Sequence, residues 1–312
     1  MLEAFLLAVI TIGISAQGII KKFYNGKVSS KGVFIFSAIS VFSACLFFVC
    51  SGGFKFEFDP IIIPYALGFA ACFGAASVAG FYAIVHGSLS LTSLVTSYSL
   101  IIPTFYGLIF NKEKVNAFFW IGFSLLCVSL FLINSKIGAK KAPVDSAEVK
   151  KNEGEEIKIT LAWVIFALVA FVCNGLCSTI QPAAVKVFNA YVAEHPELSG
   201  VDYSNEFMII ALLVVTVIML VMAFFTERED IPVCTKRGWY WMVLCGVANG
   251  VVNLLVMVLS TRMNNSLMFP IISAGGIILT GIVCRFFYRE KLTSGQYIAL
   301  VLGVAAVVFM NL

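Results

Sequence analysis

Residues 264–311 read NNSLMFPIISAGGIILTGIVCRFFYREKLTSGQYIALVLGVAAVVFMN. An apolar run from Ser266 and a second from Ile298 flank the short charged connection RFFYREKL. A helix needs roughly 20 apolar residues to span the hydrocarbon core of a bilayer, which is about 30 Å thick. The stretch therefore predicts a transmembrane helical hairpin.

The same pattern occurs 177 residues earlier, in SLVTSYSLIIPTFYGLIFNKEKVNAFFWIGFSLLCVSLFLIN, which begins at Ser93. In this alignment Glu290 falls on Glu113 and Asn311 falls on Asn134. Apolar runs match one another by chance, so the comparison depends on the charged turn and the terminal asparagine. The chain is therefore predicted to contain two copies of one unit, with independent helices of similar composition as the alternative.

The composition indicates a polytopic membrane protein. Of the 312 residues, 60% are hydrophobic and 12% are charged, whereas about 25% of residues are charged in an ordinary soluble protein. No basic segment precedes the first apolar run and no small-residue cleavage site follows it, so we expect a retained helix rather than a cleaved signal. The net charge of +4 comes from loop residues beside the spans. We therefore expect no nucleic-acid partner.

Continuous apolar runs predict an all-α integral membrane protein with ten transmembrane helices, because barrel strands would alternate in polarity over about ten residues. The charged segment 136–158 lacks aromatic residues and is expected to link a first five-helix repeat, 1–135, to a second, 159–312. Another long loop, 182–205, is expected to cover the mouth of a cavity. The expected spans are 2–20, 32–50, 61–85, 88–110, 117–135, 159–181, 207–225, 239–260, 265–287 and 293–312.

The distribution of lysine and arginine orients these helices. Sixteen of the 21 basic residues lie in connections that follow odd-numbered spans. Because basic loops stay on the cytoplasmic side, these connections are expected to be cytoplasmic and both termini outside. Five is an odd number of helices, so the second repeat enters the membrane from the opposite side. The repeat is therefore expected to be inverted.

Two inverted five-helix repeats, each with a Glu-Lys-Val or Glu-Lys-Leu turn before a small-residue helix, resemble the drug/metabolite transporter superfamily and its EamA-like branch. The resemblance covers essentially the whole chain. It implies that the first, third and fourth helices of each repeat surround a central substrate cavity, while the fifth helices pack outside. In one departure, small multidrug resistance relatives carry a glutamate inside their first helix, whereas neither 2–20 nor 159–181 has a carboxylate near its middle.

Two polar stripes are candidate parts of the substrate site. Residues three or four apart share one face of a helix, and inverted-repeat carriers bind solutes near the bilayer midplane. The alternative is that each hydroxyl bonds a carbonyl of its own helix. The residues are Thr92, Thr96, Ser99 and Pro103 in the first stripe, and Ser266, Pro270, Ser273 and Thr280 in the second.

Uncharged amides inside the spans form a second group of candidates. A buried amide without a partner costs roughly 1–3 kcal/mol, so these groups need either a solute or one another. Hydrogen bonding between helices is the alternative to solute binding. The candidates are Gln17, Asn174, Ser178, Gln181, Asn249, Asn253 and Ser260, with Tyr82 near the end of the third span.

The favoured function is secondary transport, in which a small polar metabolite is exported or exchanged, and an amino-acid-like solute is preferred. The alternatives are a proton-coupled multidrug or sugar/nucleoside transporter, with His86 as the candidate proton site, and more remotely an intramembrane enzyme, for which we find no catalytic motif. We expect no catalytic residue, cofactor or metal, and read His195 as part of a solvated loop. The expected partners are the substrate and membrane lipid, with the protein a monomer or homodimer in a bacterial cytoplasmic membrane.

The orientation can be tested with single cysteines in intact cells. A membrane-impermeant thiol reagent added outside should label Leu312→Cys and leave Lys150→Cys unlabelled, because basic connections stay inside. Labelling of Lys150→Cys without labelling of Leu312→Cys would reverse the orientation.

Overall fold

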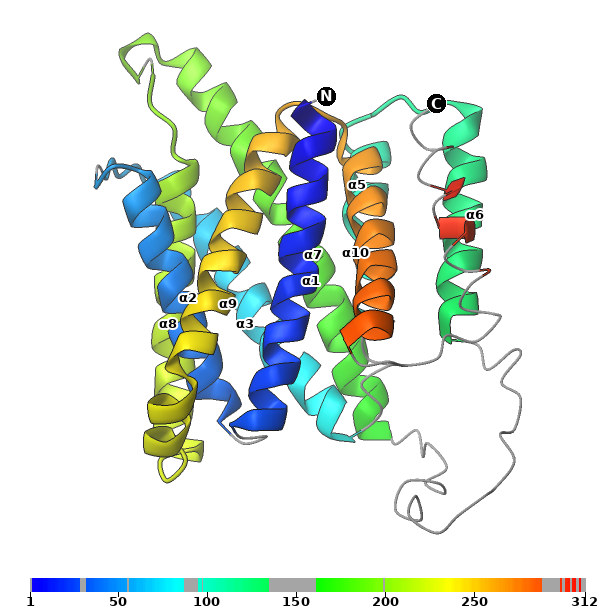
Figure 1. Ribbon diagram of the computed structural model, residues 1–312. Coiled ribbons are helices and arrows are strands. Elements are labelled where there is room, and N and C mark those ends of the chain that lie inside the picture. Colours follow the sequence, from blue (N-terminus) through cyan, green and yellow to red (C-terminus); the bar gives the residue numbers. More distant parts are fainter. Residues whose placement is uncertain are drawn as a thin grey trace, which may run out of the picture.

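The described part of the chain is helical. The computed structural model describes residues 2–28, 32–54, 56–86, 95–96, 98–134, 161–198, 200–287, 298, 301–303, 305–306 and 309, and these contain no strand (Figure 1). The elements are α1 (Leu2–Lys27), α2 (Val33–Ser51), α3 (Ile62–His86), α5 (Ile101–Ile109), α6 (Ala117–Asn134), α7 (Leu161–Glu194), the short 3-10 helix η1 (Pro196–Leu198), α8 (Ser204–Thr226), α9 (Ile231–Ser260) and α10 (Asn265–Phe287).

Six of the described helices are long and apolar enough to cross a membrane, namely α1, α2, α3, α7, α8 and α9. This confirms the all-α, multi-span architecture that the apolar runs predict. The helix α5 covers only the second part of the expected span 88–110. The linker 136–158 lies outside the described residues, as does most of the expected span 293–312.

Helices from the two sides of the linker pack mainly against one another. We call residues 1–135 the N-terminal half and residues 159–312 the C-terminal half. The helix α2 packs against α8 and α9, α3 packs against α7 and α8, α1 packs against α9 and α10, and α5 packs against α7 and α10. Every one of these pairs joins one half to the other. The two halves are therefore interlocked rather than separate bodies.

The described connections alternate between the two ends of the bundle. The helix ends that flank the α1–α2 and α8–α9 connections lie at the lower end in Figure 1, and the α2–α3, α5–α6 and α9–α10 connections lie at the upper end. The lower connections are those that the distribution of basic residues assigns to the cytoplasm. The structure therefore groups them at one end, and their cellular side remains a prediction.

The largest apolar cluster is centred on the contact between α2 and α8. Its fully buried members include Phe48 of α2 with Phe207 and Leu212 of α8. The helix α9 approaches this cluster closely, because a Cβ atom on Gly246 would collide with the backbone oxygen of Ser40. Glycine at this position therefore lets the two helix backbones come into contact.

One expectation about the loops is wrong. Residues 182–194 belong to α7, which continues through Pro182 to Glu194. Proline removes one hydrogen bond from a helix, but the following turns bury Phe188, whose ring packs edge-on against Tyr65 of α3 at 5.6 Å. The burial of Phe188 therefore outweighs the tendency of Pro182 to end the helix. With 34 residues, α7 is about 51 Å long and extends beyond the bilayer core.

Gly246→Ala and Gly18→Ala form a matched pair for testing the α2–α9 contact. The first should lower the stability of the purified protein by about 1–3 kcal/mol, because the added methyl group forces the backbones apart. The second should cause no loss, since nothing lies within 4 Å of a Cβ built at Gly18. The measurement is the Tm in detergent, and an unchanged Tm for Gly246→Ala would contradict the close approach.

Candidate functional site

Four amide side chains form a chain of hydrogen bonds across three helices. Asn249 of α9 donates from Nδ2 to Oε1 of Gln17 on α1 at 3.2 Å. Asn253, one turn later on α9, donates to Oδ1 of Asn249 at 2.7 Å. Gln181 of α7 donates from Nε2 to the backbone oxygen of Asn253 at 3.0 Å. We call Gln17, Asn249, Asn253 and Gln181 the amide network; it joins the N-terminal half to the C-terminal half.

The amide network is uncharged and only partly covered. Gln17, Asn249 and Asn253 are half-buried, and Gln181 is 4% exposed. Each amide carries both a donor and an acceptor group, so its members can bond one another and still offer groups to a ligand. Such an arrangement suits a polar solute and does not require burial of an unpaired charge.

A second polar contact joins α7 to the segment before α5. Asn174 donates from Nδ2 to Oγ of Ser99 at 2.6 Å, and Ser99 donates to the backbone oxygen of Thr96 at 2.5 Å. Ser99 is fully buried, whereas Thr96 and Asn174 are half-buried. Ser178 donates to the carbonyl of Asn174 at 3.1 Å, within its own helix. Of this group, Thr96, Asn174 and Ser178 are half-buried, and Ser99 is the least accessible.

A corresponding contact lies between α1 and α10. Ser15 donates from Oγ to the backbone oxygen of Gly276 at 3.4 Å. Gly276 is the residue that falls on Ser99 in the repeat alignment, so each of these positions accepts a hydrogen bond from a helix of the other half. Ser273 lies three residues earlier on α10 and is 8% exposed. Ser15 did not appear among the sequence candidates, because a single serine in an apolar run carries no periodic signal.

The remaining candidate residues make local contacts or are buried between helices. The ring of Tyr82 on α3 stacks on Phe166 of α7 at 5.4 Å between centroids. Ser260 donates to the carbonyl of Met257 within α9. Pro103, Ser266 and Pro270 are buried where α5 and α10 pack together. Thr92 and the side chains of His86 and Thr280 lie outside the described residues.

Among the residues that the structure describes, no group of three or more His, Cys, Asp or Glu side chains could hold a metal ion. His195 follows the end of α7, and its Nδ1 lies 2.8 Å from the backbone oxygen of Tyr191. Its ring lies 4.3 Å from that of Tyr191. Local contacts therefore account for the position of this histidine.

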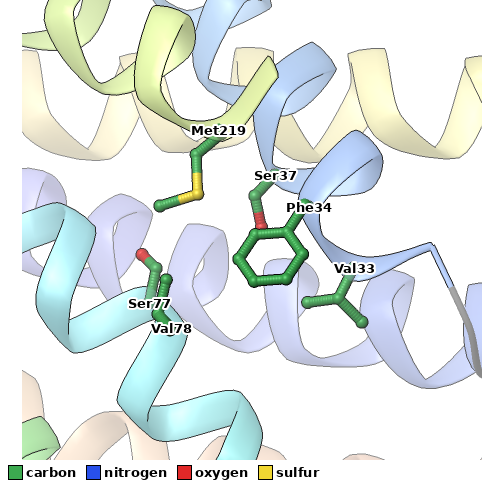
Figure 2. Close-up of a pocket in the computed structure, with 6 residues that line it drawn as sticks. All are labelled: Val33, Phe34, Ser37, Ser77, Val78 and Met219. Carbon is green, nitrogen blue, oxygen red and sulfur yellow. The ribbon is translucent and has the colours of Figure 1, made fainter. Parts of the chain in front are cut away.

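A narrow crevice lies elsewhere in the bundle, between α2, α3 and α8. Figure 2 shows the six side chains around it: Val33, Phe34, Ser37, Ser77, Val78 and Met219. Four of them are apolar, and Ser77 donates to the carbonyl of Phe73 in its own helix. The crevice contains no member of the amide network, so it is a packing gap and not the candidate solute site.

Comparison with known proteins identifies the family. Residues 157–312, half of the chain, match the model of the EamA-like transporter family. The chain belongs to the EamA-like transporter family. It is thus a multi-pass membrane transporter of the drug/metabolite type, and its family is one of transporters rather than enzymes. This confirms the resemblance noted from the repeated charged turn.

The fold of this EamA-like transporter also occurs in solved structures. One, titled only "Crystal structure of protein", superposes with a TM-score of 0.70 over 98% of this chain and 95% of that chain, at 12% sequence identity. At that identity the likeness shows the fold alone. No curated protein matches the chain significantly.

Replacing Asn249 by alanine measures how much the amide network contributes to stability. The side chain makes one hydrogen bond to Gln17 on α1 and one to Asn253 in the next turn of α9. Hydrogen bonds between helices in membranes contribute about 0.6 kcal/mol each on average. Asn249→Ala should therefore lower stability by about 1 kcal/mol, seen as a small decrease in Tm. Asn189→Ala, at an exposed amide on α7, is the control. A loss of several kcal/mol would indicate that the network mainly stabilises the fold.

Proposed function

We propose that this EamA-like transporter carries a small polar solute, zwitterionic or uncharged overall and amino-acid-like in its groups, by alternating access. The observation that supports this most is the amide network, whose uncharged donors and acceptors come from both halves of the chain and of which Gln17, Asn249 and Asn253 are only half-buried. Amides can bind a carboxylate through N–H donors and an ammonium or hydroxyl group through carbonyl oxygens. The polarity of the site therefore matches a solute with both kinds of group.

The distribution of the network over both halves fits a carrier better than a static binder. Gln17 lies on α1 of the N-terminal half, and Asn249 and Gln181 lie on α9 and α7 of the C-terminal half. Inverted-repeat carriers move one group of helices against another around a site near the midplane. A solute bound between Gln17 and Asn249 would bridge helices of the two halves and sense their relative movement.

The charge pattern supports exchange or facilitated diffusion over proton antiport. In the described spans, Asp, Glu, Lys and Arg occur in the terminal turns or in extensions beyond the apolar segment and not near the middle. Ionisable groups within a membrane mark proton relays because their burial is costly. A central carboxylate that could release and bind protons is thus missing from this part of the chain.

Purified protein in liposomes tests the proposal. Thermal stabilisation by amino acids, nucleosides and sugars first selects a solute, and counterflow of that labelled solute should then proceed without a pH gradient. Asn249→Ala and Asn174→Ala should each reduce counterflow about tenfold or more, since a lost hydrogen bond to a charged solute group costs roughly 1.5–3 kcal/mol. The matched control Asn189→Ala should transport normally.

Two results would count against this function. Normal counterflow in the Asn249→Ala variant would remove the amide network from the solute path, and normal counterflow in the Asn174→Ala variant would remove Asn174. Uptake that needs an imposed pH gradient and is abolished by His86→Gln would instead indicate a proton-coupled carrier.

A further inference from the structure

The turn between α5 and α6 holds a buried carboxylate against the start of α10. Glu113 lies in this turn, and its side chain is 6% exposed. Its Oε2 accepts the backbone N–H of Ser266 at 2.9 Å, and its Oε1 accepts that of Asn265 at 3.3 Å. Nζ of Lys186 on α7 lies 3.7 Å from Oε1. One side chain of the N-terminal half thus contacts two helices of the C-terminal half.

The charge of Glu113 suits this position. The first N–H groups of a helix have no partner within the helix and carry a partial positive charge. Burial by itself raises the pKa of Glu113, but hydrogen bonds from Ser266, Asn111 and Asn265 outweigh it and lower the pKa below its usual value. A lowered pKa in the folded state means that the carboxylate stabilises the fold at neutral pH, and that this stabilisation is lost only as the pH falls through the lowered value.

The start of α10 contains capping residues that are not used in this arrangement. It reads Asn264-Asn265-Ser266, and asparagine and serine are favoured N-cap residues. A capping Asn264 would accept the N–H of Ser266, but that N–H is bonded to Glu113. Asn264 is exposed, and Oδ1 of Asn265, a residue only 1% exposed, has no hydrogen-bond partner. The first turn of α10 therefore has a second way to satisfy its amides.

A similar contact at the other end of the bundle lacks this alternative. Glu227, after α8, accepts the backbone N–H groups of Val33, Phe34 and Ile35 at 2.7, 3.0 and 3.1 Å. The N-cap of α2 is Gly32, which has no side chain and a φ of 86°. If Glu227 withdrew, the N-cap residue of α2 could not replace it.

The two helices also lie in apolar clusters of different size. The helix α2 contributes many members of the largest apolar cluster. The first turns of α10 belong to a smaller cluster, in which Met268, Phe269 and Ile272 meet α1 and α9.

We propose that Glu113 is a positioning residue that closes the α5–α10 end of the transporter by capping α10, and that Asn264 takes over the cap when Glu113 withdraws. The helix can then leave the α5–α6 turn while the N–H of Ser266 stays hydrogen-bonded. Glu227 is a fixed cap that stays in place throughout. The inference rests on the proposed function, because a carrier needs one end of the bundle to open.

Hydrogen exchange of the solute-free protein in nanodiscs tests the exchange of caps without any transport assay. Glu113→Gln keeps the shape but places an NH₂ group, which cannot accept, beside the two amides. Exchange in peptides covering residues 263–270 should become about tenfold faster, because Asn264 can accept the N–H of Ser266 but not that of Asn265, which loses its charged acceptor. Glu227→Gln, the matched control, should accelerate residues 33–36 and leave 263–270 unchanged. Equal exchange at 263–270 in wild type and Glu113→Gln would overturn the proposal.

A double-mutant cycle tests the role of Asn264. Asn264→Ala alone should change neither the Tm nor exchange at 263–270, because the cap is unused while Glu113 is bound. In the Glu113→Gln background the same substitution should add a further increase in exchange, so the two effects are not additive. Additive effects, or a large effect of Asn264→Ala alone, would show that Asn264 is not the alternative cap.

The outcomes separate this inference from the proposed function. If the exchange measurements come out as expected and no solute is transported, the alternative caps stand and the proposed function fails. If counterflow is observed and Glu113→Gln leaves both exchange and counterflow unchanged, the proposed function stands and Glu113 is only a turn residue.

Discussion

Packing between the two halves is the constraint on which the rest of the structure depends. In a bilayer, lipid chains are as apolar as leucine, so helices associate through close contact and hydrogen bonds rather than through the hydrophobic effect. Gly246 allows that close contact, and Ser40 adds a hydrogen bond to the carbonyl of Met242 at 2.9 Å in the same place. Because α2 lies against α8 and α9, and α3 against α7 and α8, the halves form one interlocked unit.

The same interlocking brings the polar side chains together. Gln17 and Asn249 lie 232 positions apart in the sequence and hydrogen-bond across α1 and α9. Each bond of this kind contributes little to stability, and the groups remain half-buried. In the proposed function, weakly bonded and half-buried amides exchange their internal partners for a solute at low cost.

The helix α10 illustrates how a helix end can be held by a removable partner. Unpaired N–H groups at a helix start need an acceptor, and the structure supplies one from another element, in Glu113. An acceptor from a separate element can leave, whereas a cap within the same chain segment cannot. The helix α10 has a capping residue of its own in Asn264, whereas α2 has only Gly32 at this position. This difference bears on which of the two helices can move.

Local sequence patterns are enough to predict the class of fold and most of the candidate residues. Long apolar runs, polar residues at helical spacing and a repeated charged turn are local properties, and they correctly predicted an all-α, multi-span protein of the EamA-like family. The amides of the network were all identified in this way. Their pairing was not, because residue spacing within one helix contains no information about the helix that lies opposite.

Which local tendency prevails depends on the packing of the folded protein. Pro182 suggested the end of a helix, but burial of Phe188 against Tyr65 and Tyr203 continues α7 for three more turns. Glu113 has Lys114 beside it in sequence, yet its contacts are Lys186 and the first amides of α10. In both cases the outcome depends on residues that are distant along the chain. Packing and hydrogen bonding between distant residues exist only once the halves have come together, so no local pattern records them.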